Sequence, residues 1–207
     1  MALTYPLTVV PELVWRGARF AARNAAAMRA SPFTGQQQVY AHPGEWWLLD
    51  VELPPLSRAN AEEVVGFGLG LNGVEGTFLM APPGNQSGVR GTWAGGSPLV
   101  NGASQTGKTL AVDGLSAGAT ILRGDWFSLG SGSSTRLHKV TYPSTANGSG
   151  QANLEIWPRL RSSPADNAPL TINGPLGHWR LLEPIEWDIG LAMIYGLSFR
   201  LIEAVTP

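Results

Sequence analysis

The 207-residue sequence contains no cysteine, which excludes disulfide bonds, thiolate metal ligands and a cysteine nucleophile. Charged residues are also few: they make up 14% of the chain, against about 25% in average soluble domains. With 14 lysines and arginines against 15 aspartates and glutamates, the net charge of −1 gives no basic excess that would favour nucleic acid or an anionic membrane as a partner. A surface this poor in charge suits a subunit that its neighbours cover.

Long hydrophobic runs are absent as well. Residues 1–11 lack a basic segment followed by a sustained apolar stretch, so no secretory signal is expected. The longest weakly charged stretch, residues 64–80, contains five glycines and Glu75, and it is shorter than the ~20 apolar residues that a spanning helix needs. We therefore expect no membrane partner.

Candidate catalytic and metal-binding residues are scarce. His42, His138 and His178 are scattered, with no second histidine at ligand spacing, so we expect surface or strand-end histidines and no metal site. Glu186 and Asp188 share one strand face by alternation, and two carboxylates could in principle serve a glycosidase. Adjacent acids on a strand are more often solvated surface. We therefore predict no catalytic, cofactor-binding or metal-binding residues, and no enzyme.

One motif resembles a phosphate-binding site. Residues 102–109 match the P-loop pattern G-x-x-x-x-G-K-[ST], in which backbone amides surround phosphates and the lysine, here Lys108, reaches them. Such a loop requires a helix directly after it. Residues 110–120 instead alternate in polarity and contain two glycines, which predicts a strand and a turn. We favour a glycine-rich turn here and keep a P-loop nucleotide hydrolase as a remote alternative.

Alternation predicts strands through the first part of the chain. The first thirty residues are ambiguous, with a strand favoured, and residues 31–35 form a turn. A short strand over 36–41 is followed by a break at 42–44. The clearest strand is 45–53. It places Trp47, Leu49, Val51 and Leu53 on one face and Trp46, Leu48, Asp50 and Glu52 on the other.

A single helix is predicted over residues 58–71, with Ser57 as its N-cap and Asn72-Gly73 at its end. Its glycines weaken it, so it should depend on close packing against a neighbour. A strand follows over 76–81. The apolar stripe that should face a sheet consists of Ala61, Val64, Val65, Gly68 and Leu69.

The middle of the chain predicts a separate β unit. Residues 82–107 are rich in turn formers, and short strands follow at 109–112, 126–129, 136–142 and 151–157, the last closed by Pro158. After a polar connection over 162–174, three more strands are expected at 177–182, 185–189 and 194–204, the last apolar on both faces.

These elements together predict a mainly β fold. A β-sandwich with one α-helix is expected from residues 1–90 and 173–207, with residues 91–172 forming an inserted small β-barrel.

Tryptophan is abundant for a chain of this length. Some of these side chains could form a sugar-stacking platform, which makes a carbohydrate-binding module an alternative function. Trp46 and Trp47 point to opposite faces of one strand, so at least one should pack against another element or subunit. The eight residues are Trp15, Trp46, Trp47, Trp93, Trp126, Trp157, Trp179 and Trp187.

Two ordered series of segments carry a family resemblance. The first is SPFTGQQQ (31–38), GEWW (44–47), LPPL (53–56), LGLNG (69–73) and GTFL (76–79); the second is GDWF (124–127), RLHKV (136–140) and LEIWPRLR (154–161). In this order the first series resembles the first domain of phage tail-tip proteins related to the distal tail protein of long-tailed bacteriophages. The second is similar to the portion inserted in the same proteins, so the resemblance covers most of the chain.

The resemblance implies a structural virion protein without catalysis or cofactors. Such a protein would form a homohexameric ring at the distal end of the tail, within the baseplate or tail tip, after synthesis in the host cytoplasm. Its partners would be the tail tube protein, the tail-tip hub protein and the tape measure protein. We hypothesise that the strands at 45–53 and 194–204 contribute to the ring, because both carry apolar residues on two faces.

Overall fold

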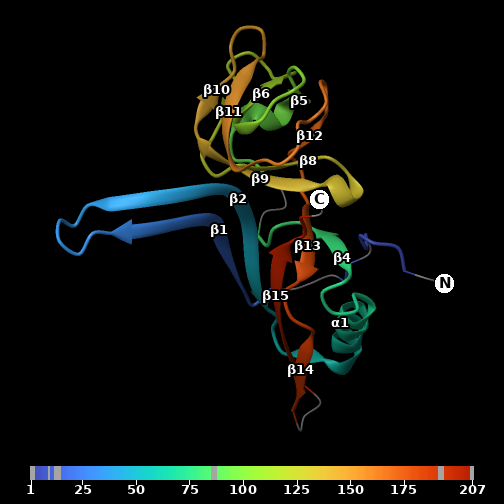
Figure 1. Ribbon diagram of the computed structural model, residues 1–207. Helices are drawn as coiled ribbons and strands as arrows, with labels where there is room; N and C mark the ends of the chain where they lie inside the picture. The colour runs from blue at the N-terminus through green and yellow to red at the C-terminus, as the bar shows by residue number, and fades with distance from the viewer. Residues whose placement is uncertain (1–2, 9, 12–14, 85–87, 191–193, 206–207) are drawn as a thin grey trace.

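The computed structural model describes residues 3–8, 10–11, 15–84, 88–190 and 194–205. Two β-sheet units lie one above the other, with one α-helix beside the lower unit and a long hairpin that extends away from it (Figure 1). No helix in the described ranges is long and apolar enough to cross a membrane.

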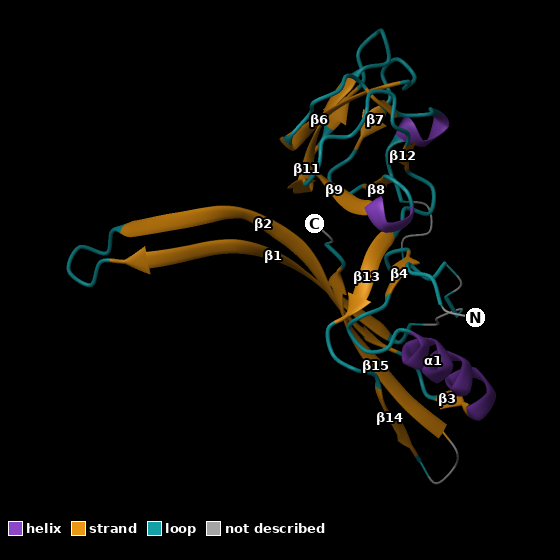
Figure 2. Ribbon diagram, turned by 45° about the vertical axis from the view of Figure 1, so that its right-hand side comes forward, coloured by secondary structure: helices purple, strands orange, loops and turns teal. Residues whose placement is uncertain are grey.

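The lower unit is a seven-stranded sheet built from both ends of the chain. Helix α1 (Arg58–Gly70) lies against it (Figure 2). The order of the main strands is β1 (Gly17–Ala30), β2 (Gln37–Glu52), β15 (Ile194–Glu203), β13 (Gly177–Leu181) and β4 (Thr77–Met80), while β14 (Glu186–Ile189) and β3 (Leu56–Ser57) each pair with β15.

The upper unit is a nearly closed, barrel-like sheet of six strands. Its two end strands meet through an isolated bridge between Leu99 and Pro169 and a 2.9 Å hydrogen bond from Val100 N–H to the Ala168 carbonyl. The strand order is β12 (Leu170–Thr171), β8 (Trp126–Leu129), β9 (Arg136–Tyr142), β11 (Ala152–Leu160), β6 (Gly107–Asp113) and β5 (Leu99–Val100). Beside it lie the pair β7 (Thr120–Ile121) and β10 (Ser144–Thr145) and the 3₁₀ turns η1 (Thr92–Gly95) and η2 (Gly132–Ser134).

The predicted fold class is confirmed: the protein is mainly β, with one α-helix, several sheets and a nearly closed, barrel-like sheet of six strands. The strands of the lower sheet come from residues 17–80 and 177–203, and those of the barrel from 99–171. The domain boundaries at 90/91 and 172/173 stay a prediction. The strand favoured in the first thirty residues is confirmed as β1.

Each unit has its own hydrophobic core. The lower core is formed by the inner face of the sheet and the buried side of α1, and it includes Trp126 and Leu137 from the barrel strands β8 and β9. The second core fills the barrel, with Leu110, Phe127 and Leu154 fully buried. Because barrel side chains enter the lower core, the two units share apolar packing.

The strand containing Trp46 and Trp47 is longer than predicted. The expected break at 42–44 is wrong, because β2 runs on through it. The break is instead a bulge: the pairing with β1 steps from Asn24 with Glu45 to Ala26 with Ala41, so three residues of β2 lie opposite Ala25 alone. Pro43, which has no N–H to donate, falls in this interruption of the ladder.

The helix matches its prediction except at one position. Ala61, Val64, Val65 and Gly68 are buried, but Leu69 is exposed, because it lies about 90° from the middle of this stripe at 100° per residue. A Cβ at Gly68 would stand 2.4 Å from Ile185 Cδ1, which accounts for the glycine through close packing. Ser57 occupies the N-cap position, but its side chain makes no capping hydrogen bond.

Two predictions for later strands are wrong. Pro158 does not close its strand but lies within β11, at a point where the pairing with β6 shifts register and needs no N–H. The last strand, β15, is not apolar on both faces. One face is buried, and the other carries Ser198 and Arg200, the latter paired with Asp50 at 3.4 Å.

Two neighbouring leucines of β2 test the assignment of its faces. Leu49 is 0% exposed in the core, whereas Leu48 is half-buried on the opposite face. We expect Leu49→Ala to lower the free energy of unfolding by about 2–5 kcal/mol, because a buried cavity is created. Leu48→Ala should cost roughly 1 kcal/mol. Urea unfolding measures both, and equal losses would contradict the assignment.

Candidate functional site

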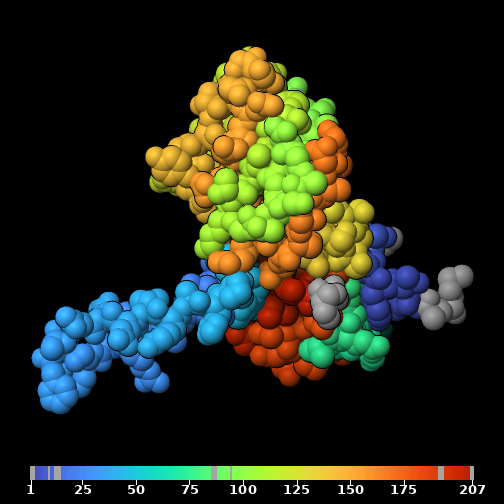
Figure 3. Space-filling model, turned by 45° about the horizontal axis from the view of Figure 1, so that its top comes forward, coloured from blue at the N-terminus to red at the C-terminus, as the bar shows by residue number. Residues whose placement is uncertain are grey.

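The most exposed element is the outer part of the β1–β2 hairpin, residues 22–44, which we call the arm. It projects from the body, and no other described element covers it (Figure 3). Met28 is 59% exposed, Val39 65% and Phe33, at the tip, 95%. Large apolar side chains at such exposure, on a two-stranded element, indicate a surface that another molecule covers.

The register of the arm separates its two faces. Phe20 of β1 packs in the core, so the even-numbered residues of β1 continue the core face of the sheet along the arm. That face carries Ala26 and Met28, with Ala41 and Val39 opposite them. This face continues the hydrophobic side of the sheet apart from Asn24 near the root, while the exposed Tyr40 lies on the other face, opposite Ala27.

The other face of the arm is basic. Arg23 and Arg29 lie on it, directly opposite Trp46 and Gln38. The arm contains two arginines and no aspartate or glutamate, which leaves 12 basic and 15 acidic residues, a net charge of −3, in the rest of the chain. The sequence patterns predicted strands and a turn in this region but no projecting hairpin. The signal that could have indicated it is the absence of any acidic residue from 17 to 44.

An aromatic cluster holds the root of the arm between the two units. Trp47 of β2 packs edge-on against Trp157 of β11, with ring centroids 4.1 Å apart, and lies 5.0 Å from the ring of Trp126 in β8. Its indole N–H donates to the Leu137 carbonyl of β9 at 3.1 Å. A single residue of β2 thus contacts three barrel strands, as the predicted opposite orientations of Trp46 and Trp47 allow.

A buried carboxylate stands beside this cluster. Glu45 accepts a 2.8 Å hydrogen bond from the Arg159 backbone N–H and forms a 2.7 Å ion pair with Lys108 Nζ. Burial alone would raise the pKa of Glu45, but these donors and the charge of the Arg159 side chain outweigh it and hold the pKa below its ordinary value. The lysine of the P-loop pattern therefore serves as a counter-ion between the units.

A second buried carboxylate lies on β15. Glu203 accepts hydrogen bonds from the Trp47 backbone N–H at 3.2 Å and from the guanidinium of Arg161 at 2.7 Å. Burial raises the pKa of Glu203, and the Arg161 charge offsets this only in part. Glu45 therefore bonds the root of the arm to the barrel, and Glu203 bonds the same root, through the Trp47 N–H, to β15.

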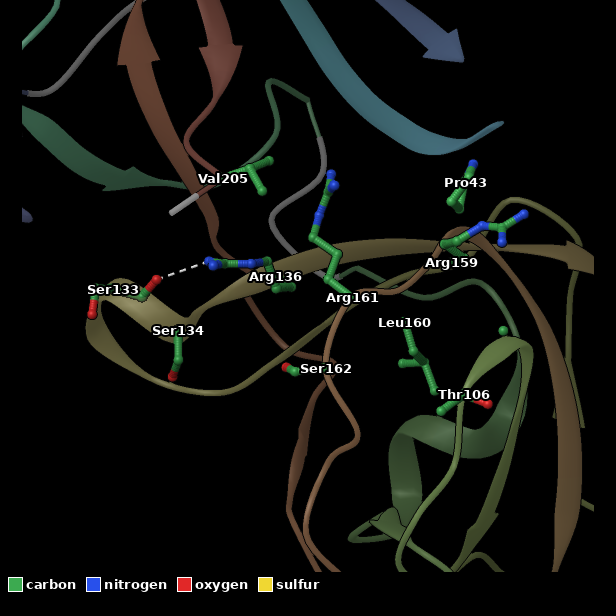
Figure 4. A pocket seen from close by; sticks show the side chains of 11 residues that line it. Pro43, Thr106, Ser133, Ser134, Arg136, Arg159, Leu160, Arg161, Ser162 and Val205 are labelled. Atoms are coloured by element: carbon green, nitrogen blue, oxygen red, sulfur yellow. Dashed lines mark hydrogen bonds between the residues drawn. The ribbon is translucent and has the colours of Figure 1, made fainter. Parts of the chain in front are cut away.

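An open cleft of about 920 Å³ lies next to these carboxylates, between the barrel and the C-terminal segment (Figure 4). It presents three guanidinium groups, from Arg136, Arg159 and Arg161, together with serine and threonine hydroxyls. Arg136 donates to the Ser133 and Thr135 carbonyls and has no carboxylate within 4.0 Å among the described residues. Arg159 and Arg161 are paired with Glu45 and Glu203, so Arg136 is the one guanidinium of the cleft without a carboxylate partner among the described residues, and this does not by itself indicate a reaction.

The P-loop pattern does not form a phosphate cradle. Lys108 and Thr109 lie in strand β6, which begins two residues before the predicted strand at 109–112, where a nucleotide site would need a helix. The side chain of Gln105 fills the loop: its amide group donates to the carbonyls of Asn101, Gly102 and Ala111 and accepts from the Ala111 N–H. The space that a phosphate would occupy is taken by the chain itself.

The prediction of surface or strand-end histidines is wrong for His138, which is buried inside β9; His178 lies near the start of β13 but is not on the surface. His42 is exposed on the arm, but His138 and His178 are buried, because their strands cross the contact between the units. His138 Nδ1–H donates to the Pro158 carbonyl at 2.9 Å. His178 lies near the Ser133 and Ala204 backbone, but neither of its ring nitrogens meets hydrogen-bond geometry. The described residues contain no cluster of three potential metal ligands.

The carboxylate pair and most of the tryptophans named in the sequence differ in exposure. Glu186 and Asp188 are exposed on β14, as expected for a solvated strand. Of the eight tryptophans, Trp47, Trp93, Trp126 and Trp179 are buried and three others half-buried. Trp187, on β14, is the single tryptophan above a third exposed in the described part.

Comparison with known proteins identifies no relative: no model of a known protein family matches the chain, and a search of curated proteins finds no match.

Acidification should destabilise the protein through its buried histidines. Burial is the main cause that lowers the pKa of His138 and of His178 to about 4, from 6.5 in the unfolded chain. Between pH 6.5 and 4 the unfolded state therefore binds more protons than the folded state, and stability falls as the pH decreases through this window. Each histidine contributes at most roughly 3 kcal/mol.

We expect His178→Phe to flatten this pH dependence, because the variant has one fewer group that takes up a proton on unfolding. Urea unfolding at pH 7, 5.5 and 4.5 measures the slope. His42→Phe, on the exposed arm, is the control and should keep the wild-type slope. An unchanged slope in His178→Phe would show that this ring does not drive the acid sensitivity.

Proposed function

We propose that this chain is a non-enzymatic structural protein of a bacteriophage tail tip, which assembles into a ring between the tail tube and the tail-tip hub. The observation that carries the proposal is the arm, whose apolar face has no partner among the described residues. The resemblance of the two ordered series of segments supplies the tail-tip context, and the mainly β fold with one helix and a small barrel is the fold class predicted from the sequence.

The energetics of the arm support assembly. An isolated two-stranded hairpin is at best marginally stable in water, and the arm adds exposed methionine, valine and phenylalanine to that weakness. Packing against another subunit removes this apolar surface from water, at about 25 cal/mol per Å². The arm is firmly held at its root by Trp47 and Glu45, so its position relative to the body is set before it meets a partner.

In this proposal the ring is a homohexamer, and its neighbours are the tail tube protein, the hub protein and the tape measure protein. The protein belongs to the virion, at the distal end of the tail. The carbohydrate-binding alternative needs several exposed aromatic rings close together. The exposed rings of the described part are divided among the arm (Phe33 and Tyr40), the barrel (Tyr142) and β14 (Trp187), which gives this alternative little support.

Shortening the arm tests the proposal. Ala26 and Ala41 are directly paired, so residues 27–40 can be replaced by an Asn-Gly turn. We expect the wild type to form oligomers, alone or with the tail tube protein, and the shortened variant to be a folded monomer. Light scattering over a concentration series gives the mass, and circular dichroism verifies the fold.

A second variant replaces only the tip. Asn-Gly in place of residues 31–36 joins the paired residues Ala30 and Gln37 and keeps the Met28 and Val39 face, so it should still assemble. A wild-type protein that stays monomeric under every condition, with and without the tube protein, would overturn the proposal and favour the carbohydrate-binding module.

A further inference from the structure

Two strands of the lower sheet have an open edge. In the described part of the chain, β1 pairs only with β2, and β14 pairs only with β15. Each therefore presents a row of backbone N–H and C=O groups without a strand partner, a form of edge to which another chain readily adds. The β1 edge runs along the arm, and the β14 edge lies at the opposite end of the sheet from the barrel (Figure 2).

The two faces of β14 differ in chemistry. Trp187 and Ile189 lie opposite Leu197 and Tyr195, whose side chains are buried, so they belong to the core face. Both remain exposed, at 38% and 54%. Glu186 and Asp188 belong to the outer face, and neither forms an ion pair within 4.0 Å with a described residue.

The arm strand β1 has the complementary chemistry on the same two faces. Its core face carries Ala26 and Met28, and its outer face carries Arg23 and Arg29. Neither arginine has a carboxylate within 4.0 Å in the described structure, and the arm itself contains none. The edges of β1 and β14 therefore match in both polarity and charge.

We propose that the β1 edge of the arm pairs with the β14 edge of a second copy of this chain, so that one sheet continues into the next. In this arrangement the apolar residues of both strands share the core face, and one of the two arginines of the arm lies beside Glu186 and Asp188. The inference rests on the proposed function, because it names the contact between subunits that the arm makes.

Charge also selects this pairing over the symmetric ones. Two β1 edges would place arginine beside arginine, and two β14 edges would place carboxylate beside carboxylate, and like charges on neighbouring strands destabilise a sheet. Pairing of β1 with β14 uses different surfaces on the two copies. Such a head-to-tail contact repeats from copy to copy and closes into a ring when its rotation allows.

A charge-reversal experiment tests the contact. Arg23 and Arg29 are six positions apart on β1, about 20 Å, which is more than the four residues of β14 can face, so both arginines are changed together. Three variants of the full chain are compared by light scattering: R23E/R29E, E186R/D188R, and the combination of all four changes. R58E/R123E, which reverses two exposed arginines on α1 and the barrel, is the control.

We expect each charge-reversed pair to shift the assembly midpoint to at least tenfold higher concentration, and the fourfold variant to return to within about threefold of the wild type. The control should assemble like the wild type. If the wild type assembles and E186R/D188R assembles equally well, or the fourfold variant is not restored, the β1–β14 contact is wrong while the proposed function stands. A wild type that stays monomeric both alone and with the tail tube protein would overturn both.

Discussion

The packing of Trp47 is the constraint on which the rest of this structure depends. Its indole ring packs against tryptophans of two barrel strands, and its N–H donates to a carbonyl of a third strand. Leu49 and Val51, on the same face of β2, belong to the core of the lower sheet. One strand thereby anchors both units and then leaves them as the arm. Because β2 both packs against the barrel through Trp47 and continues into the arm, the packing of Trp47 also sets the direction of the arm.

The charged groups around Trp47 make the same junction specific. Glu45 precedes Trp47 by two residues on β2, and Glu203 accepts a hydrogen bond from the Trp47 backbone N–H. Each carboxylate is also bonded to basic groups from the barrel. Buried carboxylates contribute little net stability unless their partners are all in place, and removal of one partner leaves an uncompensated charge. Such a network disfavours alternative arrangements of the two units more strongly than apolar packing alone would.

The bulge at 42–44 separates a buried half of the hairpin from an exposed half. On the body side, β1 and β2 are covered on one face by the core. On the arm side, the same alternation continues without a cover. A hydrophobic pattern that persists beyond the edge of its own core is understandable when another molecule completes it. The low charge of the chain agrees with a protein whose surfaces are largely covered after assembly.

The sequence by itself determined the local structure. Alternation over 45–53 was sufficient to predict a strand and its two faces, strands were also predicted at 136–142 and 177–182, and the loss of a helix after Lys108 was visible in the residues that follow it. These features depend on neighbours along the chain, whose spacing is the same in every fold. The mid-chain strands also indicated the small barrel, because turn residues recur between them at regular intervals.

Only the tertiary structure decided where distant residues meet. The burial of His138 and His178 and the pairing of Lys108 with Glu45 depend on contacts between segments far apart in sequence. The arm illustrates the reason most clearly. Its strands have the same alternation as those of the core, and whether an alternating strand is covered depends on what lies across from it, which local sequence does not encode.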